Sequence, residues 1–213
     1  MTRALNRANA SAVSSTWWGD LEVDLERGVH VAVGPLDLWV FRLERDWRVV
    51  SRRTTDRHIA RADLLAPDFV LPADTTELRV AVRQTRGPLS ITPALADRPI
   101  VARPLSPIHL PGGESVDFYL STPLWLRLGE AHNERPFHEL PTQRLSDTWF
   151  GRTTTAGELC YASKKSAEER RADVQTHPGR AITKTTITNL GTQTLQLERV
   201  ALPLPSMALF LDA

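Results

Sequence analysis

The sequence predicts an all-β protein of two packed β-sandwich-like (immunoglobulin-like) halves with little helix. Three observations carry this prediction: apolar and polar residues alternate with a period of two along much of the chain, glycine-containing turns separate the alternating runs, and segments with helical periodicity are few. A period of two is typical of strands with one buried face. Strands at this spacing, joined by short turns, favour a sandwich.

The N-terminal half is predicted to span residues 17–95, after a flexible tail over residues 1–16. The tail has no continuous apolar run, so it does not fit a secretory signal. A transit peptide shares its arginine-, serine- and alanine-rich composition, but we interpret the segment as a tail. Trp17 and Trp18 follow. We interpret them as an apolar anchor at the start of a strand rather than as an exposed aromatic platform.

Alternating runs in the N-terminal half predict its strands. Gly28 is expected to lie in a turn between two such runs. The segment "PLDLWVFRLERDWRVVSRR" predicts an inner strand and its hairpin partner, with the turn at residues 44–46. The run "TELRVAVRQ" predicts a strand with Leu78 and Val80 on its buried face. Residues 55–67 are expected to form a turn or two of helix.

The C-terminal half is predicted to be a β-sandwich spanning residues 96–213. Its strands are expected in "ESVDFYLS", "PLWLRL", where three leucines share one face, "TLQLERV" and "SMALFL". Prolines cluster between residues 67 and 141, and because proline donates no ladder hydrogen bond this favours edge strands and linkers there. Residues 163–178 contain helix formers but few apolar residues, which predicts an exposed loop or a short helix.

Charge and cysteine content limit the function classes. The chain has 26 basic and 25 acidic residues, a formal net charge of +1, so no global field attracts nucleic acid or an anionic membrane. Cys160 is the single cysteine, which excludes an intrachain disulfide and any need for an oxidising compartment. No apolar run is long enough for a membrane-spanning helix. These features predict a cytoplasmic protein without membrane insertion and without a nucleic-acid partner.

Four segments carry a resemblance to a known family: "PLDLWVFRLERDWRV", "STPLWLRLGE", "RLSDTWFGRTTTAGELCYASK" and "AITKTTITNLGTQTLQLERVALPLP". Together they resemble the uncharacterised prokaryotic family called domain of unknown function number 432, over nearly the whole chain from Trp17 onward. The resemblance implies a soluble prokaryotic protein with no assigned activity and no catalytic residues to carry over. It also implies an association with small-conductance mechanosensitive channels.

A ligand- or partner-binding site is predicted in the strand pair around residues 144–161. Its candidate residues are Arg144, Asp147, Trp149, Arg152 and Tyr161. Arginine and aspartate can form charge-assisted hydrogen bonds, and the two aromatic rings can stack on a ligand. In an extended strand Asp147 shares a face with Trp149, where a half-buried strand would present an apolar residue. The plain alternative is that Asp147 caps a turn and Trp149 belongs to the core.

A second candidate is a metal site in the loop that holds His132, Glu134 and His138. Zinc accepts two histidines and a carboxylate, with a further ligand here from His109 or Glu158. The spacing matches no zinc motif, however. We therefore interpret the segment as a solvated polar loop, and the predicted cofactor is none.

A third candidate surface is rich in arginine. Its members are Arg42, Arg45, Arg48, Arg52, Arg53, Arg57 and Arg61. Trp39 and Trp47 lie among them, as in a surface that binds single-stranded nucleic acid. Acidic residues are interleaved with these arginines, which favours a solvated face with ion pairs. Cys160, between two apolar neighbours, is interpreted as an inert buried thiol.

The leading functional prediction is a non-catalytic interaction or ligand-binding module that binds a protein partner or itself, and the family resemblance adds a role as an accessory to a membrane channel. No nucleotide-binding loop, dinucleotide fingerprint or nucleophile elbow is present. The alternative is a metal-dependent hydrolase that uses His132, Glu134 and His138. Whether the chain is an enzyme stays open, with the absence of these motifs favouring a protein that is not.

Overall fold

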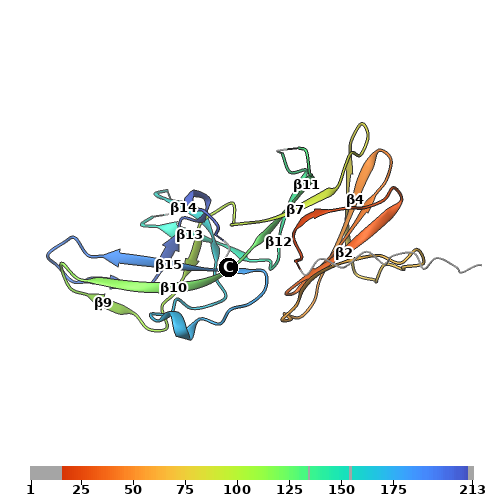
Figure 1. Cartoon of the computed structure of the whole chain (residues 1–213). Coiled ribbons are helices and arrows are strands. Elements are labelled where there is room, and N and C mark those ends of the chain that lie inside the picture. The colour runs from red at the N-terminus through yellow and green to blue at the C-terminus, as the bar shows by residue number, and fades with distance from the viewer. Residues whose placement is uncertain (1–15, 134, 154, 211–213) are drawn as a thin grey trace, which may run out of the picture.

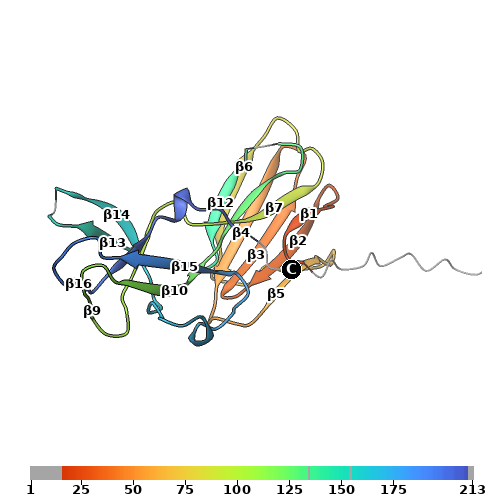
Figure 2. The same ribbon diagram turned by 60° about the vertical axis from the view of Figure 1, so that its left-hand side comes forward.

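The computed structural model of the chain describes residues 16–133, 135–153 and 155–210. Within these ranges the regular structure is β-strand, apart from two single-turn 3-10 helices, η1 (Arg171–Asp173) and η2 (Leu204–Ser206). This confirms the all-β prediction. Figures 1 and 2 show two β bodies placed end to end, which we call the first and the second half. The predicted tail falls outside the described residues except for Thr16.

The first half contains a five-stranded antiparallel sheet with the order β5-β2-β3-β4-β6. Its strands are β2 (Arg27–Val33), β3 (Leu36–Arg42), β4 (Asp46–Arg53), β5 (Ala60–Leu64) and β6 (Thr76–Ala81). The predicted inner strand is β3, which pairs with β2 on one side and β4 on the other. The hairpin turn between β3 and β4 is closed by Leu43 N, which donates to Asp46 O over 2.9 Å. The predicted hairpin is thus confirmed.

A four-stranded sheet with the order β1-β7-β11-β12 packs on the five-stranded sheet. Its strands are β1 (Gly19–Leu21), β7 (Leu89–Ala94), β11 (Trp125–Glu130) and β12 (His138–Pro141). Leu124, Leu126 and Leu128 share the buried face, as predicted, and enter one core with Trp47 of β4. Trp17 is buried in the same core, which confirms the anchor interpretation. At about 25 cal/mol per Å² of apolar surface, this burial is the main term that holds the two sheets together.

The second half contains three smaller sheets around a second core. The strands are β8 (Ile100–Ala102), β9 (Ile108–Leu110), β10 (Ser115–Pro123), β13 (Ser146–Gly151), β14 (Gly157–Ala162), β15 (Arg180–Thr188), β16 (Leu195–Leu197) and β17 (Val200–Leu202). One sheet has the order β13-β14-β8-β17, and β10-β15 and β16-β9 are strand pairs. Phe118 and Leu120 of β10 are fully buried here. The packing is sandwich-like, whereas an immunoglobulin-like strand order stays a prediction.

The two halves meet along the four-stranded sheet. β11 and β12 lie after residue 96 in the sequence, yet β11 pairs with β7 of the first half and β12 pairs with β11. Alternation explains the double role of β11, because Leu126 points into the first core while its neighbour Trp125 points into the second. Gly179 stabilises the contact between the halves, because its carbonyl accepts hydrogen bonds from Leu124 N and from Thr142 Oγ1.

Three local predictions were wrong. The segment expected to be helical around residue 60 is the edge strand β5, because pairing with β2 outweighs its weak helical pattern. Gly28 lies inside β2 rather than in a turn; a Cβ there would lie 2.6 Å from Phe41 Cδ1, so the site needs glycine for packing. The expected C-terminal strand is the 3-10 turn η2 followed by irregular chain to Phe210, since Pro203 and Pro205 provide no ladder donor.

Residues 163–178 contain η1 and otherwise irregular chain, held to the second half by a bridge between Pro104 and Ala167. Among the described residues no helix has the length and apolar content needed to cross a membrane.

Candidate functional site

The predicted site lies on the antiparallel hairpin of β13 and β14 in the second half (Figure 2). In the register of this hairpin Asp147 faces Tyr161, and Trp149 faces Leu159. Because side chains alternate along a strand, these four residues project from the same side of the sheet. We call this side the Trp149 face. The sequence predicted that Asp147 and Trp149 share a face, and the register agrees.

Polar residues organise one end of the Trp149 face. The Tyr161 hydroxyl donates to Asp97 Oδ1 over 2.9 Å, and Arg98 Nη1 donates to Asp147 Oδ1 over 3.3 Å. The Arg98 guanidinium also lies 5.3 Å from the centre of the Tyr161 ring. Burial, and then the hydrogen bond to Asp97, raise the pKa of the Tyr161 hydroxyl above its ordinary value, so the phenol remains a neutral donor.

Sequence reasoning missed Asp97 and Arg98. They belong to the connection between β7 and β8, far from the hairpin in sequence. No local pattern links them to it, because only the pairing of β8 with β14 brings this connection beside Tyr161.

Trp149 forms the apolar centre of the face. Its side chain is 40% exposed, and the Leu159 side chain opposite is 45% exposed. The indole Nε1 donates to Thr153 O over 2.8 Å, which fixes the ring against the turn that follows β13. The other five tryptophans of the chain are buried or half-buried. Trp149 is therefore the most exposed tryptophan of the chain.

The two predicted arginines lie beyond the ends of β13. Arg144 precedes the strand and lies near Arg53, whose pKa is lowered by burial and then by the positive charge of Arg144. Arg152 lies in the turn after the strand, where its backbone N–H donates to Ala156 O. A six-residue strand is about 17 Å long, so the structure does not gather both arginines around one small ligand.

The opposite side of the hairpin carries Thr148, Phe150 and Cys160. Cys160 is fully buried, and burial, followed by the nearby charge of Glu158, raises the pKa of its thiol. A raised pKa disfavours the thiolate, which is the reactive form. Arg199 covers this side: its guanidinium lies 5.1 Å from the centre of the Phe150 ring, and its Nη2 donates to Trp149 O over 2.8 Å.

The histidine loop does not assemble within the described residues. Glu134 lies outside them, and elsewhere no group of three histidine, cysteine, aspartate or glutamate side chains is close enough to hold a metal ion. His138 lies in β12 opposite Leu128, and burial lowers the pKa of its ring. Glu130 has a structural partner: its Oε1 accepts from Trp47 Nε1 over 3.0 Å and from Arg86 N over 2.8 Å. The other suggested ligands, His109 in β9 and Glu158 in β14, belong to the second half.

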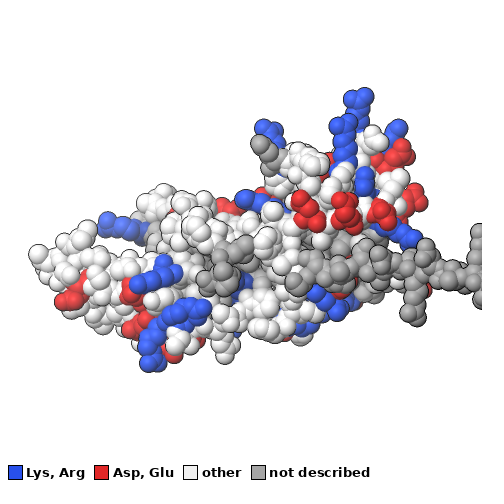
Figure 3. Space-filling view, in the orientation of Figure 1, with Lys and Arg blue, Asp and Glu red and all other residues white. Residues whose placement is uncertain are grey.

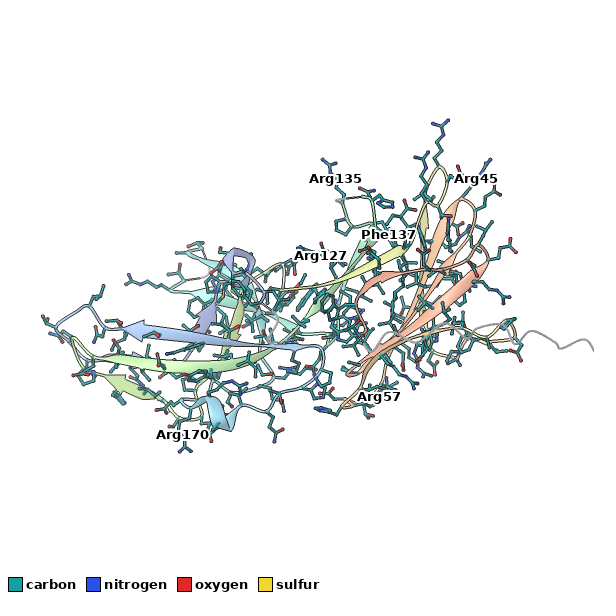
Figure 4. The ribbon with its side chains drawn as sticks, viewed as in Figure 1. Arg45, Arg57, Arg127, Arg135, Phe137 and Arg170 are labelled. Carbon is teal, nitrogen blue, oxygen red and sulfur yellow. The ribbon has the colours of Figure 1, made fainter. Side chains whose placement is uncertain are left out.

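The arginine-rich surface consists largely of ion pairs. Arg48 pairs with Glu77, and Arg61 with Asp63. Figure 3 shows basic and acidic side chains intermixed over the first half. Arg45 and Arg57 lie at opposite ends of this half (Figure 4), so the arginines do not form one stripe along a nucleic-acid backbone.

Asp37 forms the most buried charge cluster of the first half. Its carboxylate is 3.0 Å from His30 Nε2, 3.0 Å from Arg57 Nη2 and 3.4 Å from Arg52 Nη2. Burial by itself would raise the pKa of Asp37, but the hydrogen bonds from Arg57 and His30 outweigh it and lower the pKa below its ordinary value. The ring of His30 stacks on Trp39 at 5.0 Å. This cluster stabilises the outer side of the five-stranded sheet.

The comparisons with known proteins give one result. No curated protein and no solved structure matches the chain. One family model matches residues 17–213, from the buried Trp17 through both halves of the fold. The chain thus belongs to the family described as protein of unknown function (DUF432).

Proposed function

We propose that this protein is a non-catalytic binding module, and that the Trp149 face docks a partner protein. The observation that carries the proposal is the exposure of Trp149 beside Leu159 on the β13–β14 hairpin. Tryptophan is strongly enriched among the residues that dominate protein–protein binding energy, and a large exposed apolar side chain held in one orientation suits such an anchor.

The dimensions of the site favour a protein over a small ligand. The predicted residues Arg144, Asp147, Trp149, Arg152 and Tyr161 extend over both ends of a strand about 17 Å long. A partner that contacts them all must have a surface of that length. An apolar centre with a polar rim is also the usual anatomy of a protein interface.

Charge indicates the chemistry of the partner. Arg98 is shared between two carboxylates, Asp97 and Asp147, so this end of the Trp149 face keeps a negative excess. The Asp147 side chain is 62% exposed. We infer that the partner presents an apolar side chain next to a lysine or arginine, which would pair with Asp147.

The cellular setting is part of the proposal. A chain whose only thiol, Cys160, is buried needs no oxidising compartment, so we place the module in the cytoplasm. The resemblance to its prokaryotic family suggests the first partner to test, the cytoplasmic part of a small-conductance mechanosensitive channel.

Photocrosslinking tests this proposal in cells that express the protein. A photoreactive phenylalanine analogue replaces Leu159, which leaves Trp149 in place, and mass spectrometry identifies the crosslinked protein. That protein is then purified and its affinity for the unmodified chain is measured by calorimetry. Truncation of an interface anchor costs about 2 kcal/mol or more, so Trp149→Ala should weaken binding roughly 30-fold or more.

Leu190→Ala is the matched control, because Leu190 is 92% exposed in the turn between β15 and β16. It should leave the affinity unchanged. An affinity that Trp149→Ala does not alter would overturn the proposed surface. A crosslink found only between two copies of this chain would show that the Trp149 face binds a second copy rather than a separate partner protein.

A further inference from the structure

The side of the hairpin opposite the Trp149 face borders a basic pocket of about 250 Å³. Arg103, Lys164, Lys165 and Arg199 line it, and we use the name basic pocket for the space between these four side chains. No acidic side chain lines this pocket. Within the described ranges of the chain, none of the four cations takes part in an ion pair.

Four cations without an acidic partner among the described residues therefore line one small space. The chain as a whole has a net charge of only +1, and several arginines of the first half have acidic partners, such as Arg48 with Glu77 and Arg57 with Asp37. Like charges gathered in one place repel one another and raise the local positive potential. An anion bound between them would remove that repulsion and gain charge-assisted hydrogen bonds.

The topology of the sheet explains how distant residues meet here. β14 pairs with β8 in parallel, so both strands end at the same end of the sheet. Arg103 follows β8, and Lys164 and Lys165 follow β14. β17 is antiparallel to β8, with Val200 opposite Ala102. This register places the preceding residue, Arg199, at the same end of the sheet.

Backbone hydrogen bonds hold the lining in place without a ligand. Ser163 N donates to Val101 O over 2.7 Å, and Ala167 N donates to Arg103 O over 2.8 Å. The Ser163 hydroxyl accepts from Lys165 N over 3.1 Å, which fixes the turn that carries both lysines. The site is therefore formed in advance, which lowers the entropic cost of binding.

Arg199 is also oriented before any ligand arrives. Its bond to Trp149 O and its position over the Phe150 ring fix the guanidinium plane. Only one of its N–H groups is used in that bond, and the others remain for a ligand. A planar guanidinium of this kind suits the oxygen atoms of a phosphate group.

The other lining groups define the class of anion. Thr148, Ser163 and Ser166 add hydroxyl groups to the wall, and no histidine or carboxylate is present there to act as a general base. We propose that the basic pocket binds, without hydrolysing it, the phosphate group of a small soluble phosphomonoester. Such a group carries a charge of about −1.5 to −2 near neutral pH and three strong acceptor oxygens, which match the four cations and the hydroxyl donors of Thr148 and Ser166.

Calorimetric titration of the full chain tests the assignment, with inorganic phosphate and glycerol 3-phosphate as probes at constant ionic strength. Wild type should bind both probes at one site per chain. The double variant Arg103→Gln/Lys165→Gln should bind them more weakly by roughly 100-fold or more, because it removes two charge-assisted hydrogen bonds and each contributes about 1.5–3 kcal/mol. Thermal melting without ligand should show that this variant is folded, since the change removes repulsion and breaks no ion pair.

Arg135→Gln is the matched control. Like the single pocket variant Lys164→Gln it removes one positive charge, but Arg135 lies in the first half (Figure 4), so phosphate affinity should not change. Lys164→Gln is a second pocket variant and should weaken binding while leaving the melting temperature in place. An equal loss in Arg135→Gln, or none in the double variant, would overturn the site. Citrate binding as tightly as phosphate would overturn the phosphate class.

Discussion

Replacement of Asp37 by asparagine is the sharpest test of how the first half is held together. The Asp37 carboxylate is 2% exposed and lies within hydrogen-bond or ion-pair distance of His30, Arg52 and Arg57. Asn keeps the shape and one acceptor oxygen, so Asp37→Asn removes the charge and little else.

The expected loss of stability follows from the burial of Asp37 and from the partial exposure of its two arginine partners. Removal of one member of a fully buried ion pair costs about 3–5 kcal/mol. Here the Arg52 and Arg57 side chains are 33% and 37% exposed, so water can solvate them again after the change. A charge-assisted hydrogen bond contributes about 1.5–3 kcal/mol. We therefore expect Asp37→Asn to lower the free energy of unfolding by about 2–3 kcal/mol.

Urea unfolding followed by circular dichroism measures this loss. At an m value of about 2–3 kcal/mol per molar for a chain of this size, the midpoint should fall by about 1 M, with m unchanged. Glu77→Gln is the control, since the Arg48–Glu77 pair is 37% and 41% exposed and its loss should leave the midpoint where it is. A variant at Asp37 within about 0.5 kcal/mol of wild type would refute the view that this cluster stabilises the sheet.

The same residue predicts an acid dependence of stability. The pKa of Asp37 is lower in the folded protein than in the unfolded chain, where it is near 3.8. The unfolded state therefore takes up the proton first as the pH falls. The stabilisation is fully present above about pH 3.8 and is lost as the pH falls through the folded pKa. The difference between wild type and Asp37→Asn should consequently shrink below that pH, which urea titrations at several acid pH values would show.

Three further predictions concern other parts of the molecule. Gly179 and Gly113 both have positive φ, but a Cβ at Gly179 would lie 2.5 Å from Val33 Cγ1, whereas one at Gly113 would meet nothing within 4 Å. Gly179→Ala should therefore lower the melting temperature clearly more than Gly113→Ala. Trp47→Phe removes the hydrogen bond to Glu130 and leaves a void in the first core, so urea unfolding should show a loss of about 1–3 kcal/mol. Burial lowers the pKa of His138 below 6.5, so the unfolded chain takes up the proton first and stability falls as the pH drops from about 6.5. His138→Gln should make this decline shallower in melting curves measured at several pH values.

The parts of the fold that were predictable are those that one strand or one tight turn determines. The β3–β4 hairpin and the buried face of β11 follow from alternation and turn residues alone. Residues 60–64 were not predictable in the same way. Their strand state depends on pairing with β2, which lies far earlier in the chain. The placement of β11 and β12 in the sheet of the first half likewise depends on pairing with β7, a contact that no local pattern records.

The same distinction between local and long-range contacts decides which candidate site could be predicted from the sequence. Asp147 and Trp149 are two residues apart in one strand, so their shared face could be predicted from the sequence. The basic pocket could not, because its four cations come from three connections that meet only through the parallel pairing of β14 with β8 and the antiparallel pairing of β17 with β8. In the sequence each cation lies in an ordinary polar stretch. The excess of positive charge exists only in the folded sheet, and any anion that the pocket binds must therefore bind the folded state and stabilise it, in proportion to the logarithm of its concentration once the site is saturated.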